Sequence, residues 1–216
     1  MWKGKNVTVF ITGGIAAYKV ATLVRLFVKE GAEVSVAMTK SACEFITPLT
    51  FQVLTKNKVH LDTFDEDEAN KVQHIHLADH TDVAVVVPAT ANTIAKMANG
   101  IADNFVTSTL LATTAPIYVA PAMNEHMWEN PATIRNVAQL KADGKVVIEP
   151  ASGFLAEGYN GKGRLPEPEE IFEQITFLES RRTSKSPLKG KSVLITAGGT
   201  KERIDPVRYI SNDSSG

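Results

Sequence analysis

Two adjacent glycines stand where an anion could approach the backbone. Thr12-Gly13-Gly14-Ile15 follows an apolar run at residues 7–11 and precedes a stretch with helical spacing at residues 16–30. Glycines between a strand and a helix let backbone N–H groups face an anion, and the helix N-terminus favours negative charge. The spacing matches neither G-x-G-x-x-G nor a Walker loop. A tight turn would also require glycine, so this motif by itself leaves a ligand site and a structural turn open.

Hydroxyl, amide and thioether groups follow three further apolar runs. The candidate residues are Thr39, Ser41, Pro88, Thr90, Asn92, Met123, Asn124 and Met127. The carboxyl ends of parallel strands meet at one edge of the sheet, where ligands of α/β proteins bind. Methionine offers polarizable contact to a flat aromatic ligand, although Thr or Asn after a strand can simply cap the next helix. Because successive strand ends carry such residues, we predict a nucleotide or flavin site. Ser108 adds a polar group at another expected helix start.

His74, His76 and His80 precede the third apolar run. A His-x-His pair can ligate zinc, but no cysteine lies near this one, and we expect no metal site. The histidines can equally lie on a solvated helix face. A third interpretation is a general acid or base, because an imidazole titrates near neutral pH. The residues alone do not separate these readings.

The elements that must position these residues alternate between strands and helices. Short β-branched runs occur at residues 7–11, 34–38, 83–87, 117–120 and 146–148. Such runs indicate strands buried on both faces, as in a parallel sheet. The intervening sequence predicts helices at residues 16–30, 91–99, 105–111, 132–143 and 167–178. The sequence therefore predicts an α/β fold with a doubly wound, Rossmann-like parallel sheet.

Composition narrows the class of protein further. The 216 residues include 23 Lys+Arg and 24 Asp+Glu, so there is no electrostatic reason to expect a nucleic-acid partner. No apolar run approaches the roughly 18 residues of a membrane span. Cys43 is the single cysteine, which excludes an intrachain disulfide and a zinc site built from several cysteines. We expect a cytoplasmic protein that binds neither nucleic acid nor membranes.

The character of the chain changes after the last apolar run of the sheet. Residues 152–163 are rich in glycine and are expected to form a mobile loop. The polar, basic stretch at 181–187 indicates a linker. Lys189-Gly190-Lys191-Ser192-Val193 then resembles Lys3-Gly4-Lys5-Asn6-Val7, which predicts a second α/β domain from residue 188. We therefore expect a domain at 1–180 and, at 188–216, a start of another that is too short to bury its own core.

Together the motifs resemble the flavin-dependent cysteine decarboxylases over about residues 5–180. The segments that carry the resemblance are Ile-Thr-Gly-Gly-Ile-Ala-Ala-Tyr-Lys at 11–19, His-Ile at 74–75, Pro-Ala-Thr-Ala-Asn at 88–92, Pro-Ala-Met-Asn at 121–124 and Gly-Lys-Gly-Arg at 161–164. The resemblance implies a flavodoxin-like flavoprotein. Residues 195–200 and 205–212 look like the opening of the CTP-dependent ligase domain of bifunctional enzymes of coenzyme A biosynthesis. Only that opening is present, so no ligase activity is expected from residues 188–216.

The resemblance implies FMN as cofactor and 4'-phosphopantothenoylcysteine as substrate. In this reaction FMN oxidises the cysteinyl thiol towards a thioaldehyde, which lets the carboxylate leave as CO₂. Reduction of the resulting enethiol then gives 4'-phosphopantetheine and restores the cofactor. The family assembles as homotrimers or as dodecamers of trimers, with the flavin and the active-site histidine meeting across a subunit interface.

The same resemblance assigns roles to individual residues. His74 matches the histidine that assists proton transfer, and Asn124 matches the asparagine that holds the substrate carboxylate. Met127, Ala156 and Gly158 are expected at the substrate, the latter two in a flap at residues 153–163. The expected FMN contacts are Gly13, Gly14, Ile15, Thr39, Ser41, Pro88, Thr90, Asn92, Ser108 and Met123.

One residue departs from the family pattern. The flap of the reductive decarboxylases carries a cysteine that donates a proton to the enethiol, and Glu157 stands at that position here. An exposed glutamate is almost wholly ionised near neutral pH and is a poor acid, unless a closed flap desolvates it. We therefore hypothesise that oxidation and decarboxylation are retained while the final reduction is impaired, so that the enethiol is the product.

Two other functions compete with this one. Some relatives keep the fold as non-catalytic, FMN-binding regulatory subunits, although the presence of both His74 and Asn124 favours an enzyme. A nicotinamide-dependent dehydrogenase would suit the general α/β pattern, but the G-x-G-x-x-G motif is absent.

Overall fold

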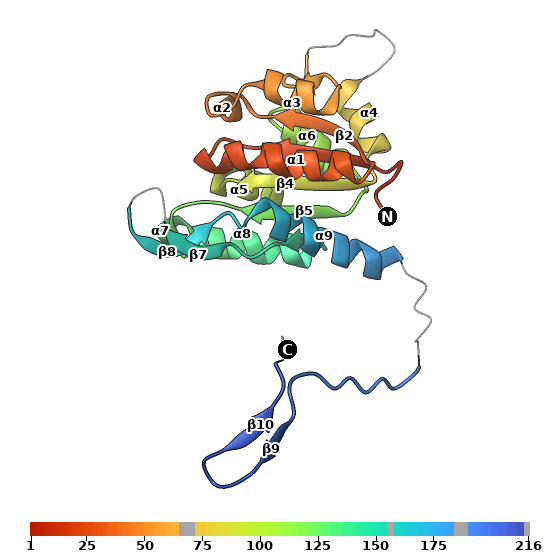
Figure 1. Cartoon of the computed structure of the whole chain (residues 1–216). Helices are drawn as coiled ribbons and strands as arrows, with labels where there is room; N and C mark the ends of the chain where they lie inside the picture. The colour runs from red at the N-terminus through yellow and green to blue at the C-terminus, as the bar shows by residue number, and fades with distance from the viewer. Residues whose placement is uncertain (65–71, 155–157, 184–189, 214–216) are drawn as a thin grey trace. The chain divides into compact units, whose positions relative to one another are not determined.

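The computed structural model describes residues 1–64, 72–154, 158–183 and 190–213. The chain divides into two compact units, Met1–Ser180 and Arg181–Gly216, which are described separately (Figure 1). None of the helices in these described segments is long and apolar enough to cross a membrane.

A six-stranded parallel sheet forms the centre of the first unit. Its strands lie in the order β3-β2-β1-β4-β5-β6. Their bounds are β1 Asn6–Ile11, β2 Glu33–Met38, β3 Val59–His60, β4 Val83–Ala89, β5 Ile117–Pro121 and β6 Val146–Val147. The order reverses between β1 and β4, which makes their carboxyl ends the topological switch point at which such sheets bind ligands.

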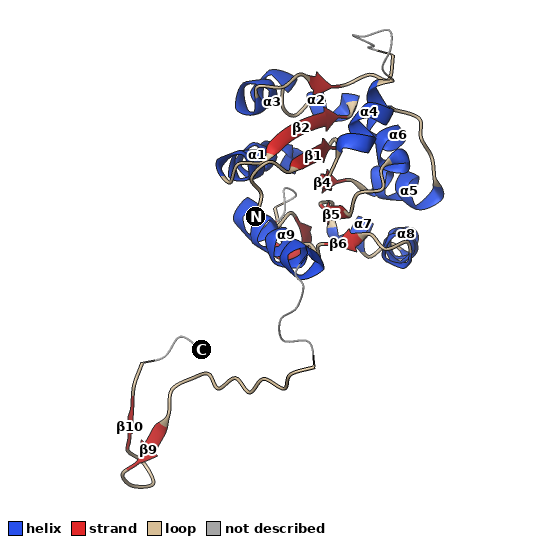
Figure 2. Ribbon diagram, turned by 90° about the vertical axis from the view of Figure 1, so that its right-hand side faces the viewer, coloured by secondary structure: helices blue, strands red, loops and turns tan. Residues whose placement is uncertain are grey.

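Helices cover both faces of this sheet (Figure 2). On one face lie α1 Val20–Lys29, α3 Pro48–Thr55 and α9 Pro168–Thr183. On the other face lie α4 Gln73–His80, α5 Ala91–Asn99, α6 Phe105–Ala112 and α8 Pro131–Ala142. The predicted doubly wound α/β fold is confirmed.

The core is divided between the two faces because successive side chains of a strand point to opposite sides. In β4, Val85 and Val87 pack into the cluster beneath α1 and α9, whereas Ala84 and Val86 pack beneath α5 and α6. All seven residues of β4 are buried. A strand between two helical layers has no solvated face, which explains its run of β-branched residues without polar alternation.

The five predicted strands and five predicted helices are present. The helix at 91–99 has the predicted bounds, and the other elements have shifted ends. The stretch at 16–30 is divided into a 3-10 turn, η1 Ile15–Lys19, and the helix α1. The sequence did not predict β3, α3, α4 or the short helices α2 Lys40–Cys43 and α7 Glu125–Trp128. The helix α9 continues through Thr183, three residues into the stretch predicted as a linker.

The prediction that residues 152–163 form a loop is wrong for the residues that the structure describes. Its described residues form an antiparallel hairpin of β7 Ala151–Phe154 and β8 Asn160–Arg164. The backbone N–H of Met123 donates to the carbonyl of Gly163 across 3.0 Å, which ties β8 to the segment after β5. Glycines hide this hairpin from pattern analysis because they lack the side chains by which strands are recognised. Residues 155–157 at its tip lie outside the described residues.

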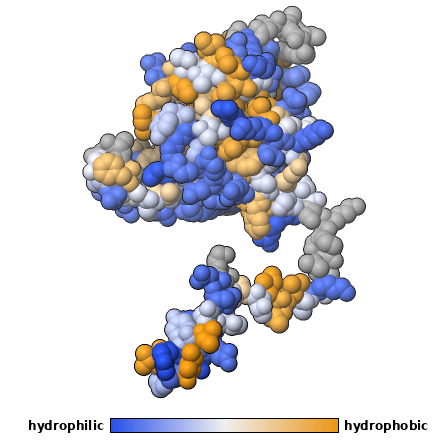
Figure 3. All heavy atoms as spheres, in the orientation of Figure 1, coloured by the Kyte–Doolittle hydropathy of each residue, from blue (hydrophilic) through white to orange (hydrophobic). Residues whose placement is uncertain are grey.

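The second unit contains another antiparallel hairpin, β9 Lys201–Arg203 paired with β10 Tyr209–Ser211. Asp205 holds the turn, because its Oδ1 accepts from the backbone N–H groups of Val207 and Arg208 at 2.9 and 2.6 Å. None of the described residues of this unit is buried. Leu194 and Val207 are 91% and 86% exposed, and apolar side chains lie on the surface of this unit (Figure 3).

Candidate functional site

Two cavities meet at the carboxyl edge of the sheet, beside the switch point. The first, of about 550 Å³, is lined mainly by polar residues after β1, β2 and β4. The second, of about 670 Å³, lies between the turn after β1, the segment after β5 and the hairpin β7–β8. Gly13 and Thr90 line both cavities. Volumes of this size suit small-molecule ligands.

A buried threonine joins the two strands that flank the switch point. The hydroxyl of Thr12 donates to the carbonyl of Pro88 and accepts from the backbone N–H of Thr90 at 3.0 Å. Thr90 in turn caps α5 by accepting from the N–H of Thr93 at 3.3 Å. These bonds join the ends of β1 and β4 directly beside Thr90, which lines both cavities. Pro88 itself, a predicted FMN contact, lines neither cavity among the described residues.

Gly13 is glycine for a steric reason. A Cβ atom on Gly13 would lie 2.4 Å from the Cβ of Ser41, so the turn after β1 could not approach α2 with any larger residue. A Cβ on Gly14 would meet atoms only at 3.9 Å, which is ordinary contact. The close approach brings Gly13 and Ser41 together in the wall of the first cavity. The sequence left open whether this glycine motif forms a structural turn or a ligand site. At Gly13 the two roles are compatible.

The first cavity contains most of the predicted polar FMN contacts. Gly13, Thr39, Ser41, Thr90 and Asn92 all line it. Thr39 also accepts from the backbone N–H of Ala42 at 3.2 Å and caps α2. Both threonines thus have the capping role that the sequence allowed as an alternative, and both still face the cavity.

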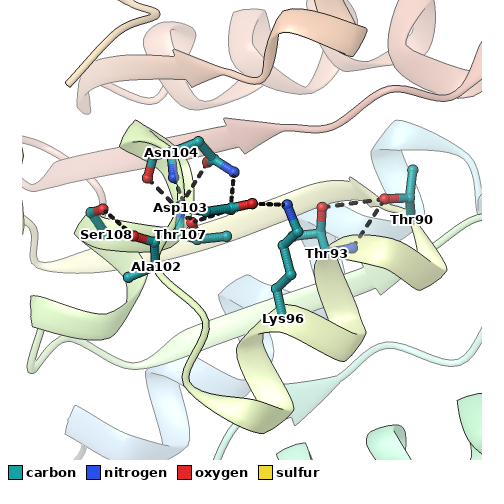
Figure 4. Close-up of polar contacts among 8 residues, drawn as sticks. All are labelled: Thr90, Thr93, Lys96, Ala102, Asp103, Asn104, Thr107 and Ser108. Carbon is teal, nitrogen blue, oxygen red and sulfur yellow. Dashed lines mark hydrogen bonds and ion pairs between the residues drawn. The ribbon is translucent and has the colours of Figure 1, made fainter. Parts of the chain in front are cut away.

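A polar network on the far side of the first cavity includes a lysine that sequence reasoning missed (Figure 4). Lys96 Nζ lies 2.6 Å from Asp103 Oδ2, and Asp103 Oδ1 accepts from Asn104 Nδ2 at 2.8 Å. The hydrogen bond from Lys96 lowers the pKa of Asp103. Asn104 caps α6 by accepting from the N–H of Thr107 at 3.1 Å. Lys96 stands on α5, seven residues before its acidic partner, and no motif in the sequence indicated that pairing.

Ser108 lies outside both linings in the described part of the chain. Its hydroxyl donates to the carbonyl of Ala102 at 3.4 Å, at the start of α6 (Figure 4). The prediction that Ser108 contacts FMN therefore has no support from this geometry.

The second cavity gathers two of the four predicted substrate residues and several predicted FMN contacts. The substrate residues are Asn124 and Met127, and the FMN contacts are Gly13, Gly14, Ile15, Thr90 and Met123. Asn124 Nδ2 donates to the hydroxyl of Tyr159 at 2.8 Å, which places the hairpin against this wall. A Cβ on Gly163 would lie 2.1 Å from the carbonyl oxygen of Met123, so β8 can pack there only with glycine. Gly158 does not line the cavity in the described segments, and Ala156 and Glu157 lie outside the described residues.

Two cations of the second cavity were not predicted as site residues. Lys19 Nζ lies 2.9 and 3.0 Å from the two carboxylate oxygens of Glu167, and Arg164 Nη2 contacts the same carboxylate. The hydrogen bond from Lys19 is the main cause that lowers the pKa of Glu167. Both cations belong to quoted motifs. Arg164 and Glu167 are only three residues apart, whereas Lys19 and Glu167 are 148 residues apart, and no local pattern indicates that second pairing.

His74 lines neither cavity in the described part of the chain. It stands on α4, edge-on to the ring of Phe105 with centroids 6.4 Å apart, and its Nδ1 is buried without a hydrogen-bond partner. His76 stacks on His80 at 4.1 Å, on the solvated side of α4. The described residues contain no group of three His, Cys, Asp or Glu side chains that could hold a metal ion.

Comparison with known proteins gives consistent matches over the whole chain. The sequence profile described as Flavoprotein matches residues 1–178, and that of the DNA/pantothenate metabolism flavoprotein C-terminal domain matches residues 188–216. The coenzyme A biosynthesis bifunctional protein CoaBC of Bacillus subtilis is 51% identical over 216 residues, which are 100% of this chain and 53% of that protein. CoaBC of Mycobacterium tuberculosis (strain H37Rv) is 46% identical over 213 residues, 98% of this chain and 50% of that protein. The chain thus spans about half the length of these curated relatives.

Solved structures resemble the first unit. A PPC decarboxylase mutant complexed with pantothenoylaminoethenethiol aligns with a TM-score of 0.74 and 33% identity, over 82% of this chain and 100% of that one. The FMN binding protein AtHal3 aligns with a TM-score of 0.73 and 34% identity, over 84% of this chain and 100% of that one.

Proposed function

This chain belongs to the Flavoprotein family, and from that premise we propose that it is an FMN-dependent decarboxylase of 4'-phosphopantothenoylcysteine. The observation that carries the proposal is the meeting of two cavities at Gly13 and Thr90, one polar and one that contains the Asn124 amide. The relatives named for coenzyme A biosynthesis and for PPC decarboxylase support the choice of substrate.

The lining of the two cavities fits a flavin nucleotide. Thr39, Ser41 and Asn92 offer hydroxyl and amide groups of the kind that bind a phosphate and a polyol chain. Met123 and Met127 offer polarizable surface for a flat ring. FMN bound there would accept a hydride from the cysteinyl side chain and return one after CO₂ leaves. The fit depends on Gly13, because a larger residue would push Ser41 out of the wall of the first cavity.

Asn124 is proposed to hold the substrate carboxylate. Its side-chain oxygen is engaged by the backbone N–H of His126 at 2.9 Å, so the oxygen is fixed and the amide nitrogen faces the cavity side where Tyr159 lies. A neutral amide can orient a carboxylate without stabilising its charge strongly. That property suits decarboxylation, because the charge leaves the carboxylate as CO₂ forms.

His74 is proposed to transfer the proton of the substrate thiol. Because His74 lines neither cavity in the described residues of one chain, we propose that a neighbouring subunit supplies it, in a homotrimer or a dodecamer of trimers. We also propose that residues 1–180 form the decarboxylase domain, that 181–187 link it onward and that 188–216 begin a ligase domain.

The reductive half of the reaction depends on residue 157. Glu157 stands where the family has its proton-donating cysteine, which favours the enethiol as an alternative product. The test is anaerobic incubation with 4'-phosphopantothenoylcysteine, followed by flavin absorbance and product mass. We expect a yellow protein whose flavin bleaches while CO₂ is lost. A flavin that stays oxidised would indicate a non-catalytic FMN-binding protein, and saturated product formed at each turnover would show that the final reduction proceeds.

A further inference from the structure

The second cavity carries an excess of positive charge. Lys19 and Arg164 are the charged residues among its described lining, which includes no acidic side chain. The first cavity differs, because Lys40 and Lys96 there are matched by Asp62 and Asp103. An excess of positive charge in a partly enclosed cavity favours an anionic ligand group.

Glu167 stands behind the two cations and holds them together. It contacts Lys19 Nζ and Arg164 Nη2 but does not itself line the cavity. One carboxylate between two cations leaves one net positive charge. The Lys19 side chain is 12% exposed and therefore largely withdrawn from water, whereas the Arg164 side chain is 42% exposed and can reach a ligand from the solvent side. A lysine ammonium has three donors and a guanidinium five, which leaves donors for a second anion after Glu167 is satisfied.

We propose that Lys19 and Arg164 bind the 4'-phosphate of the substrate, an inference that rests on the proposed function. Phosphomonoesters are bound by such lysine and arginine donors. Ile15 and Phe154 line the same cavity and suit the dimethyl part of the pantoate arm.

The reacting carboxylate is a worse occupant for this pair. A cationic site at that carboxylate would stabilise the charged ground state more than the transition state, in which the charge is leaving, and would slow the reaction. The phosphate keeps its charge throughout. Binding energy from this remote group can therefore position the cysteinyl end beside Asn124 without opposing the loss of CO₂.

The phosphate of FMN is the other candidate anion, and an experiment separates the two. Lys19→Gln and Arg164→Gln are compared with wild type by calorimetric titration with 4'-phosphopantetheine and with pantetheine, which lacks the phosphate. Flavin content is read from absorbance. We expect each variant to weaken binding of the phosphorylated ligand by about tenfold or more, the loss typical of a charge-assisted hydrogen bond. Binding of pantetheine should change less than about twofold, and flavin content should not change.

Two further variants are matched controls. Lys162→Gln removes a lysine from the same strand as Arg164, and its side chain lies outside this cavity among the described lining residues. It should leave the ratio between the two ligands unchanged. Lys19→Arg keeps the charge and should restore most of the preference for phosphate.

Each other outcome overturns the proposal. If the variants lose affinity for both ligands equally, the contacts of Glu167 with Lys19 and Arg164 serve only to stabilise the fold. If the variants lose flavin, the two cations bind the cofactor instead. Wild-type protein that binds both ligands equally would show that no phosphate site exists here. The binding assay needs no turnover, so absence of decarboxylation would count against the proposed function alone.

Discussion

The side-chain amide of Asn124 donates a hydrogen bond to the hydroxyl of Tyr159, whose oxygen lies 2.8 Å from Nδ2. Tyr159 directly precedes β8 in the hairpin β7–β8, whereas Asn124 follows β5 and lines the second cavity. The Tyr159 hydroxyl therefore accepts from the same Asn124 amide that is proposed to bind the substrate carboxylate. A substrate that uses this donor must displace Tyr159, so the hairpin and the substrate compete for one hydrogen bond.

Removal of the tyrosine hydroxyl should strengthen substrate binding. In Tyr159→Phe, Asn124 no longer has to exchange this partner, and a neutral hydrogen bond contributes about 0.5–1.5 kcal/mol. We expect KM for 4'-phosphopantothenoylcysteine to fall about two- to tenfold with little change in kcat. Steady-state CO₂ release measures both constants. A higher KM in Tyr159→Phe would contradict this view and make the hydroxyl a substrate contact.

Substitution of the first glycine should damage both folding and flavin binding. Gly13→Ala places a Cβ 2.4 Å from that of Ser41. Overpacking of this kind costs about 1–3 kcal/mol and would displace the wall common to the two cavities. We expect a lower Tm and a lower flavin content after purification. Gly14→Ala is the matched control, because its added carbon meets atoms only at 3.9 Å, and it should keep its stability. Equal behaviour of the two variants would refute the steric account.

The strength of the Lys19–Glu167 contact should depend on pH in a defined direction. Lys19 and Arg164 lower the pKa of Glu167 in the folded protein. A lowered pKa means that the pair stabilises the fold above the ordinary carboxyl pKa, and that this stabilisation is lost as the pH falls through the folded value. The Glu167 side chain is 45% exposed, so solvent screening limits the effect to about 1 kcal/mol or less.

Thermal unfolding of Glu167→Gln beside wild type measures this effect. We expect a Tm lower by roughly 3 °C near neutral pH, because about 1 kcal/mol corresponds to a few degrees for a domain of this size. The difference should shrink as the pH drops below roughly 4. A difference that grows in acid would mean that the carboxyl group stabilises the fold in its protonated form.

Local sequence predicted the central sheet because its strands are buried on both faces. The β4 run Val83–Ala89 has no polar alternation, which is typical of a strand between two helical layers. The β3 strand has two residues, Val59–His60, too few for any periodicity. The hairpin β7–β8 was not predicted. Gly153 pairs with Gly161, so backbone hydrogen bonds hold this pair together and no side-chain pattern marks it in the sequence.

The site was predictable where it depends on strand ends and not where it depends on distant pairs. Gly13, Thr90 and Asn124 each follow a strand, and parallel strands bring such positions to one edge. Lys19 and Arg164 meet only because the hairpin folds back onto the turn after β1, and the bridge through Glu167 spans 148 residues. Contacts of that kind are set by tertiary packing, which a single sequence does not display.

A mixture of two inactive variants should recover activity if subunits complete one another's sites. His74→Asn removes the proposed proton-transfer group, and Asn124→Ser removes the amide donor while it keeps an oxygen that can cap α7. Each variant alone should lose at least about 99% of wild-type kcat, in line with the contribution of a general acid or base.

If the residues of one site come from two chains, about one quarter of the interfaces in a random mixture join two intact side chains. Coexpressed chains should then show roughly a quarter of wild-type activity, measured on oligomers whose mixed composition is verified by mass spectrometry. If His74 and Asn124 serve the same site within one chain, no chain in the mixture carries both, and activity would stay at the level of the separate variants.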